Sequence, residues 1–114
     1  MELPNADQAK VDRDKITEYL LCSTHPDGGG KAKFFTRFGF RLESWDVFAQ
    51  ALREHGARHP VVKKVESAYG IRYTIDGEIE TPDGRNPRVR TVWLTEGKTT
   101  IPRLITAHPI KEAV

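Results

Sequence analysis

The residues with the clearest chemical potential lie between His25 and Ala32, where the chain reads His-Pro-Asp-Gly-Gly-Gly-Lys-Ala. Glycines let a backbone approach an anion closely, and a helix that begins after them offers free N–H groups. Lys31 adds a positive charge, and His25 is of a type that moves protons near neutral pH. The segment is not a P-loop, because Ala32 stands where Ser or Thr would bind magnesium. The alternative is a flexible connection between two helices that binds nothing.

A second set of candidates lies in residues 89–95, which form an expected strand. Thr91 and Trp93 point to the same face there, because side chains alternate along a strand. On an open face Thr91 would offer a hydroxyl to phosphate, and Trp93 would stack a base. On the core face both would be packing residues. Val92 and Leu94 are equally good core residues, and we expect these two to face inward.

The remaining histidines are weaker candidates. His108 ends the last expected strand on the same face as Thr106 and would be a second acid or base, although a plain polar role is simpler. His55 and His59 are expected to be ordinary surface side chains. No pair of histidines has the close helical spacing of a zinc site, so we expect no metal and no cofactor.

Charge is divided unevenly over the second half of the chain. Residues 76–83 carry four acids and no base, whereas residues 85–103 carry five bases and one acid. Two neighbouring strands whose charges pair across the ladder would produce this pattern. The alternative is a cationic surface for phosphate groups, which would include Arg85, Arg90 and Arg103.

Composition limits the class of protein. The chain has 114 residues, 38% of them hydrophobic and 30% charged, with a net charge of +2. This suits one globular domain over residues 1–114, and no apolar run approaches the ~20 residues of a membrane span. The first residues lack a signal-peptide pattern, and Cys22 is the only cysteine, so an internal disulfide is excluded. We expect a cytoplasmic protein.

The first half of the chain predicts helices. Asp12 is an expected N-cap, a second short helix begins at Lys31 and ends at Gly39, and Ser44 caps a third. The pair His55-Gly56 is expected to end that third helix. The expected inward side chains are Ile16, Tyr19, Leu20, Phe34, Phe35, Phe38, Trp45, Phe48, Ala49 and Leu52.

The second half predicts strands, because apolar and polar residues alternate there. The strands are expected over residues 61–69, 71–79, 89–95 and 102–108, with turns at 82–84 and 96–98. Helices followed by an antiparallel meander predict an α+β fold. About three helices would pack on one face of a three- or four-stranded sheet. The other face would be open to solvent or to a ligand.

Short motifs occur along nearly the whole chain. They are Leu-Pro-Asn-Ala at 3–6, His-Pro at 25–26, Gly-Gly-Lys-Ala-Lys-Phe-Phe at 29–35, Gly70 with Tyr73, Thr-Pro-Asp-Gly-Arg at 81–85, Val-Arg-Thr-Val-Trp at 89–93 and Pro-Arg-Leu at 102–104. In this combination the chain resembles an uncharacterised bacterial family of domains of unknown function. That resemblance implies no activity.

A looser likeness concerns the order of the elements that carry chemistry. Helices with His25 and Lys31, followed by a sheet with Thr91-x-Trp93, resemble the metal-independent RNase toxins of the barnase, EndoU, colicin D and RelE group. The colicin D branch pairs a histidine and a lysine with a strand Ser-x-Trp, and Thr91 keeps the hydroxyl. The likeness implies a toxin-type endoribonuclease. Its partners would be RNA, either tRNA or mRNA, and a cognate inhibitor protein.

We therefore expect cleavage in which the RNA 2′-hydroxyl attacks the adjacent phosphate. His25 would move the proton, Lys31 with Arg90 or Arg103 would neutralise the phosphorane, and Thr91 would bond a phosphate oxygen. The expected substrate-binding residues are Trp93, Arg85, Thr106 and His108. The alternative function is a non-catalytic module that binds protein or nucleic acid on the open sheet face.

Overall fold

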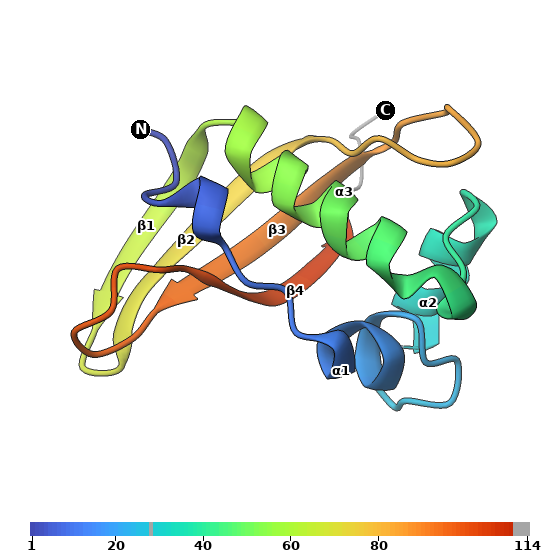
Figure 1. The fold of residues 1–114 in the computed structure, drawn as a ribbon, viewed down its shortest axis with the longest axis horizontal. Coiled ribbons are helices and arrows are strands. Elements are labelled where there is room, and N and C mark those ends of the chain that lie inside the picture. The colour runs from blue at the N-terminus through green and yellow to red at the C-terminus, as the bar shows by residue number, and fades with distance from the viewer. Residues whose placement is uncertain (28, 111–114) are drawn as a thin grey trace.

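The computed structural model describes residues 1–27 and 29–110 and has the expected α+β architecture (Figure 1). The helical elements are η1 (Ala6–Gln8), α1 (Arg13–Lys15), the π-helical η2 (Ile16–Leu20), α2 (Gly29–Arg37), η3 (Leu42–Ser44) and α3 (Trp45–Arg58). The strands are β1 (Val61–Ser67), β2 (Gly70–Glu78), β3 (Arg88–Thr95) and β4 (Arg103–Pro109). The three N-terminal helices α1, α2 and α3 pack on one face of the sheet.

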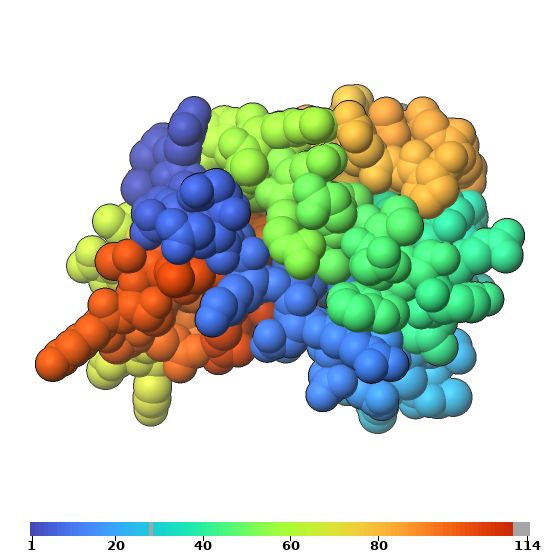
Figure 2. All heavy atoms as spheres, in the orientation of Figure 1, coloured from blue at the N-terminus to red at the C-terminus, as the bar shows by residue number. Residues whose placement is uncertain are grey.

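The sheet is an antiparallel meander with strand order β1-β2-β3-β4. Alternation along β2 buries Tyr73 and Ile75 and leaves Arg72 and Thr74 on the opposite face. The expected fourth strand is confirmed. In Figure 2 the N-terminal segment, in blue, and α3, in green, lie over the near side of the sheet. Within residues 1–27 and 29–110, no helix lies on the far face of the sheet.

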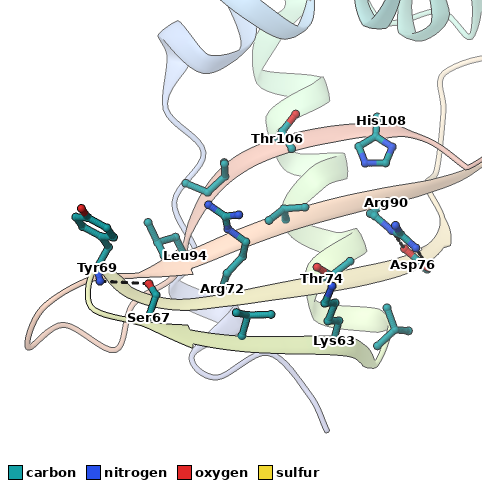
Figure 3. A pocket seen from close by; sticks show the side chains of 14 residues that line it. Lys63, Ser67, Tyr69, Arg72, Thr74, Asp76, Arg90, Leu94, Thr106 and His108 are labelled. Atoms are coloured by element: carbon teal, nitrogen blue, oxygen red, sulfur yellow. Dashed lines mark hydrogen bonds and ion pairs between the residues drawn. The ribbon is translucent and has the colours of Figure 1, made fainter.

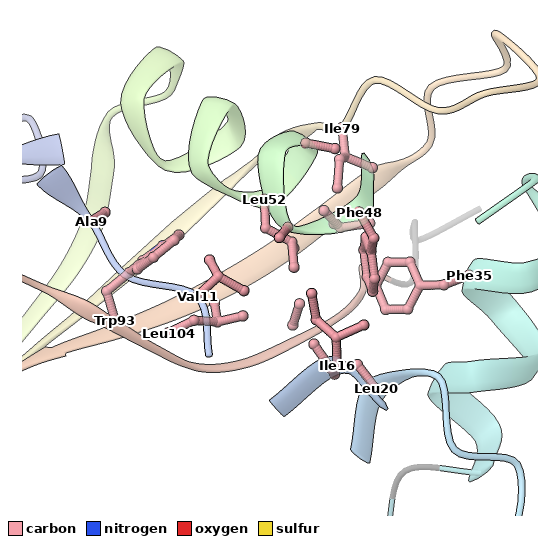
Figure 4. Packing of buried hydrophobic residues seen from close by; sticks show 14 of the residues in the cluster. Ala9, Val11, Ile16, Leu20, Phe35, Phe48, Leu52, Ile79, Trp93 and Leu104 are labelled. Atoms are coloured by element: carbon pink, nitrogen blue, oxygen red, sulfur yellow. The ribbon is translucent and has the colours of Figure 1, made fainter. Parts of the chain in front are cut away.

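The core lies between the helices and the sheet (Figure 4). Phe35 of α2 and Phe48 of α3 pack with their ring centroids 4.7 Å apart. Ile16 of η2 and Trp93 of β3 are also fully buried. Burial of four side chains of this size provides roughly 1.5–3 kcal/mol each, so the apolar stripes of the helices account for their packing.

Helix boundaries differ from expectation at two points. α2 begins at Gly29 rather than Lys31, and α3 runs through His55 and Gly56 to Arg58, so the predicted stop at His55-Gly56 is wrong. Gly56 lets α3 pack closely against the Trp93 ring, since a Cβ on Gly56 would lie 2.9 Å from Cζ2 of Trp93. Gly39, with φ of 103°, ends α2 as expected. Asp12 and Ser44 occupy N-cap positions but make no side-chain capping hydrogen bond.

An irregularity in β4 decides which of its side chains face the open side. Trp93 pairs with Leu104 and Val92 with Thr106, which leaves one extra residue in β4. Leu104 is therefore buried, whereas Thr106 and His108 lie on the open face. The outer edge of β4 is partly covered by the N-terminal segment, because Lys10 forms a parallel bridge with Arg103. These contacts place the segment around Lys10 beside β4, whereas Met1 lies at β1, where its carbonyl accepts from the Val61 N–H.

Candidate active site

The structure brings three of the predicted site residues together around Tyr19. Lys31 donates a hydrogen bond from Nζ to the Tyr19 hydroxyl, and Thr106 Oγ1 lies 3.0 Å from the same oxygen. The His25 ring packs edge-on against the Tyr19 ring, with centroids 5.0 Å apart. We call Tyr19, His25, Lys31 and Thr106 the hydroxyl cluster. It joins η2, the loop before α2, α2 itself and β4.

Electrostatics in the hydroxyl cluster favour release of the phenolic proton. The Nζ atoms of Lys31 and Lys15 lie 4.7 and 5.5 Å from the Tyr19 ring centroid. Partial burial raises the pKa of Tyr19, but hydrogen bonds from Lys31 and Thr106 and the two lysine charges outweigh it, so this pKa falls below 10.0. All four side chains of the cluster are half-buried, which keeps these charges poorly screened.

His25 of the hydroxyl cluster and His108 of β4 offer opposite hydrogen-bonding functions. The Asp27 N–H donates to His25 Nδ1 at 2.9 Å, so a neutral His25 ring carries its proton on Nε2. His108 Nδ1 lies 3.2 Å from the Pro109 carbonyl, which can only accept, so the lone pair of neutral His108 is on Nε2. His25 is thereby arranged as a donor at Nε2 and His108 as an acceptor.

The open face of the sheet forms a hollow of about 1090 Å³, which we call the sheet groove (Figure 3). Thr106 and His108 line its β4 side. Lys63, Arg72 and Arg90 add positive charge, and Asp76 is the one acid among the lining residues. The groove therefore carries a net positive charge. The other lining residues are Val62, Val65, Ser67, Tyr69, Thr74, Val92, Leu94 and Ile105.

A second, smaller hollow of about 580 Å³ lies on the other side of Tyr19. Its cations are Arg13, Lys15 and Arg103, and its acids are Asp12 and Asp14; Tyr19 completes the lining. Tyr19 belongs to this hollow and Thr106 to the sheet groove, and their hydroxyls touch. The hydroxyl cluster thus stands between two surface depressions.

Thr91 and Trp93 are not part of this site, and the prediction that Val92 and Leu94 face inward is wrong. Thr91 and Trp93 are both completely buried. Trp93 Nε1 donates to Thr91 Oγ1 at 2.9 Å, and the same oxygen lies 3.0 Å from His55 Nδ1. Because the Thr91 hydroxyl has two hydrogen-bond partners, its burial in the core leaves no polar atom unpaired. Neither side chain can reach a molecule in the sheet groove, so the phosphate and stacking roles expected for them are withdrawn.

The three candidate arginines are engaged in ion pairs. Arg90 binds both carboxylate oxygens of Asp76 at 2.7 and 2.9 Å, which confirms charge pairing across β2 and β3 at this position. Arg103 pairs with Glu96 at 2.5 Å. Arg90 still lines the sheet groove and Arg103 the second hollow. The Asp76 pKa is lowered by the Arg90 hydrogen bonds, which outweigh its partial burial.

Arg85 lies apart from the hydroxyl cluster. It pairs with Asp83 at 2.5 Å, donates to the Arg37 carbonyl at 2.8 Å and stacks 4.4 Å from the Phe38 ring centroid. These contacts fasten the 81–87 loop to the end of α2. Arg85 lines neither the sheet groove nor the second hollow.

Sequence reasoning missed Tyr19 and misplaced His55. The sequence predicts Tyr19 only as an inward residue of a helix. Its closeness in sequence to His25 and Lys31 is the one sign of a chemical role. His55 is buried, with 2% of its surface exposed, rather than a surface side chain. Burial lowers its pKa to about 4 against the opposing effect of its carbonyl partners. His59 is half-exposed and its Nε2 lies 2.8 Å from the Glu78 carbonyl.

Among residues 1–27 and 29–110, no group of three or more His, Cys, Asp or Glu side chains is placed to hold a metal ion. No helix in this part of the chain has the length and apolarity to cross a membrane.

Comparison with known proteins gives a family and a fold. A family model described as a domain of unknown function, DUF6883, matches residues 2–111. No curated protein matches the chain. Among solved structures, a chain of a contact-dependent growth inhibition toxin–immunity protein complex from Klebsiella pneumoniae 342 is similar, with a TM-score of 0.71 and 19% identity. The alignment covers 94% of this chain and 97% of that one. At that identity the likeness shows the fold alone.

Proposed function

The chain belongs to the DUF6883 family of domains of unknown function, and we propose that it is a metal-independent endoribonuclease of the bacterial toxin type. The observation that carries the proposal is the hydroxyl cluster, in which Lys31 and Thr106 contact the Tyr19 phenolic oxygen and the His25 ring packs against the Tyr19 ring. The cluster adjoins a cationic groove on an open sheet. A site of this kind suits a phosphodiester, whose charge grows as the phosphorane forms.

The reaction would begin with the RNA 2′-hydroxyl. His108 Nε2, which carries the lone pair, takes the proton of that hydroxyl while O2′ bonds to phosphorus. Lys31 and the Nε2–H of His25 donate to the non-bridging oxygens and stabilise their charge. Thr106, rather than Thr91, hydrogen-bonds a phosphate oxygen. The P–O5′ bond then breaks, which leaves a 2′,3′-cyclic phosphate and a 5′-hydroxyl end.

This assignment exchanges the roles expected for the two histidines. His25 was expected to move the proton, but the Asp27 N–H occupies its Nδ1 lone pair. A proton acceptor needs a free lone pair within hydrogen-bond reach of the group it deprotonates. His108 has its lone pair on Nε2 and lines the sheet groove. His108 is therefore the better base, and His25 the better donor.

The sheet groove would hold the RNA strand. Lys63 and Arg72 lie on this face, and charge of this kind binds phosphates with a strong salt dependence. Tyr69, 84% exposed at the β1–β2 turn, offers the aromatic surface that buried Trp93 cannot offer. Stacking of a base on such a ring is worth about 1–3 kcal/mol. A single strand with splayed bases fits these features better than a duplex does.

The proposal is tested by RNA cleavage in EDTA. Purified protein is incubated with tRNA and with mRNA, beside Lys31→Ala and His108→Ala variants. The matched control is Lys33→Ala, which removes an exposed lysine from the same helix. Discrete fragments that persist in the control and fall at least 100-fold in the two variants would support the proposal. Equal cleavage by all four proteins would point to a contaminant and reject it.

A toxin of this type requires an inhibitor protein, and we extend the proposal to such a partner. The similar fold belongs to a toxin–immunity protein complex. An inhibitor that covers the sheet groove would have to match its positive charge, so we expect an acidic surface on it.

The second candidate function is a non-catalytic binding module. Its supporting observation is the exposure of Val62, Val65 and Tyr69 at the sheet groove, at 55%, 44% and 84%. Exposed apolar side chains in one patch are typical of a protein-binding surface. Absence of cleavage by the wild-type protein, together with stable capture of a protein or RNA on this face, would favour this function.

A further inference from the structure

We infer that Tyr19 is the general acid of the proposed reaction, whose hydroxyl gives its proton to the departing 5′-oxygen. This inference rests on the proposed function and adds a catalytic residue to it. Departure of an RNA 5′-oxygen without a proton would leave a strongly basic alkoxide. Some group near the hydroxyl cluster must therefore supply that proton.

The hydrogen bonds at the Tyr19 oxygen suit that task. Lys31 can only donate, so one lone pair of the phenolic oxygen already accepts a bond from its ammonium group. Thr106 Oγ1, at 3.0 Å, can either accept the phenolic proton or donate its own. When Thr106 donates, two donors hold the oxygen and its proton is available to a ligand. The same two donors stabilise the phenolate that remains after proton transfer.

The placement of the Tyr19 hydroxyl beside Thr106 and of His108 on β4 also suits an acid and a base that act on the same phosphodiester. Thr106, which touches the Tyr19 hydroxyl, and His108 lie two residues apart on one face of β4. Two residues of a strand span about 7 Å. With this spacing along β4, an acid held at Thr106 and a base at His108 can each reach one end of a single phosphodiester. In-line displacement requires this arrangement, because the attacking and leaving oxygens lie on opposite sides of phosphorus.

The titratable and charged groups that face Tyr19 come from several elements, and the two lysines among them favour proton release. Lys31 comes from α2, Lys15 from the end of α1, and His25 from the loop before α2. Arg103 of β4 lines the adjoining hollow, with Asp12 and Asp14 as the acids there. The pKa of Tyr19 is lowered from 10.0 as a result, mainly through the Lys31 hydrogen bond and in spite of burial.

The proton and bond changes balance over one turnover. The O2′–P bond forms as the 2′-hydroxyl proton passes to His108. The P–O5′ bond breaks as the Tyr19 proton passes to O5′. The products are a cyclic phosphate, a 5′-hydroxyl, protonated His108 and a Tyr19 phenolate beside the Lys31 ammonium. Transfer of one proton from His108 to Tyr19 through water restores the enzyme.

The test compares two leaving groups. Wild type and Tyr19→Phe are given an RNA oligonucleotide with an ordinary scissile linkage and one with sulfur in place of the bridging 5′-oxygen. A thiolate leaves without protonation, so loss of a general acid affects only the ordinary substrate. We expect Tyr19→Phe to cleave the ordinary RNA about 100- to 10,000-fold more slowly. It should cleave the sulfur substrate at nearly the wild-type rate.

The alternative outcomes separate this inference from the proposed function. Equal slowing of Tyr19→Phe on both substrates would mean a positioning role and would overturn the inference. Wild-type rates on both would also overturn it and leave the nuclease intact. If the wild-type protein cleaves neither substrate, the proposed function fails and the inference fails with it. Thermal unfolding of Tyr19→Phe, which keeps the ring, verifies that the variant is folded.

The pH profile gives a second readout that packing alone does not move. Wild-type cleavage should decline on the alkaline side as the phenol ionises, at a pH below 10 because the Tyr19 pKa is lowered. In Tyr19→Phe that alkaline decline should disappear. Persistence of the same decline in the variant would contradict the assignment.

Discussion

The His55 imidazole and the Thr91 hydroxyl meet inside the core, with Nδ1 of the histidine 3.0 Å from Oγ1 of the threonine. His55 Nε2 lies 3.1 Å from both the Gly77 and the Val89 carbonyls, so it must be the protonated nitrogen. Thr91 therefore donates to Nδ1 and accepts from Trp93. This chain of hydrogen bonds ties α3 to β2 and β3, and it requires a neutral His55.

Acid should weaken the fold through His55. Its pKa is about 4 in the folded protein and about 6.5 in the unfolded chain, so the unfolded state binds more protons between these values. Stability is then complete above pH 6.5 and falls towards pH 4, by as much as about 3 kcal/mol. Urea unfolding across this range measures it. His55→Leu should flatten the slope, whereas His59→Gln should keep it; equal slopes in all three proteins would contradict the prediction.

Removal of the Thr91 hydroxyl should destabilise the protein without touching the site. Thr91→Val keeps the shape but leaves the Trp93 N–H and His55 Nδ1 unpaired in the core. We expect a loss of about 1–3 kcal/mol in the free energy of unfolding. Denaturant unfolding measures this loss. Thr106→Val, at a half-buried position on the open face, is the matched control and should cost less; the reverse order would refute the assignment of Thr91 to the core.

Gly56 should tolerate no side chain. A Cβ there would lie 2.9 Å from the rigid Trp93 ring, so Gly56→Ala must push α3 away from the sheet. The expected cost is about 1–3 kcal/mol. Gly30→Ala is the matched control, since a Cβ on Gly30 has no atom within 4 Å and α2 gains a better helix former. In thermal unfolding, the midpoint of Gly56→Ala should lie below that of wild type and the midpoint of Gly30→Ala above it.

RNA binding should depend on Arg72 and not on Arg85. Arg72 lies in the sheet groove, whereas Arg85 is fastened to Asp83 and the end of α2. Arg72→Ala should weaken binding of single-stranded RNA and lower the salt slope of the affinity by about 1. Fluorescence anisotropy at several salt concentrations measures both quantities. A similar effect of Arg85→Ala would show that RNA binds elsewhere.

Much of the fold was predictable because it follows from periodicity. Alternation along β2 and the apolar stripe of α3 indicated the right elements and the right layers. The end of α3 was not accessible in this way. The pair His55-Gly56 has the composition of a helix end, but tertiary contacts with Thr91 and Trp93 keep it helical.

The face of β3 could not be predicted, because both sets of alternating side chains contain good core residues. The choice depends on His55, which satisfies the Thr91 hydroxyl from another element. Prediction of the site was consequently partial. His25, Lys31 and Thr106 do converge, but they do so on Tyr19 rather than on Thr91. The extra residue in β4, which places Thr106 on the open face, leaves no clear trace in the sequence.

The most direct measurement is the chemistry of the RNA ends that the wild-type protein produces in EDTA. Purified protein is incubated with tRNA, and the fragments are analysed by mass spectrometry for their terminal phosphates. A metal-independent attack by the 2′-hydroxyl predicts 2′,3′-cyclic phosphate and 5′-hydroxyl ends. Intact tRNA at high protein concentration, or fragments with 5′-phosphate ends, would contradict the proposed endoribonuclease.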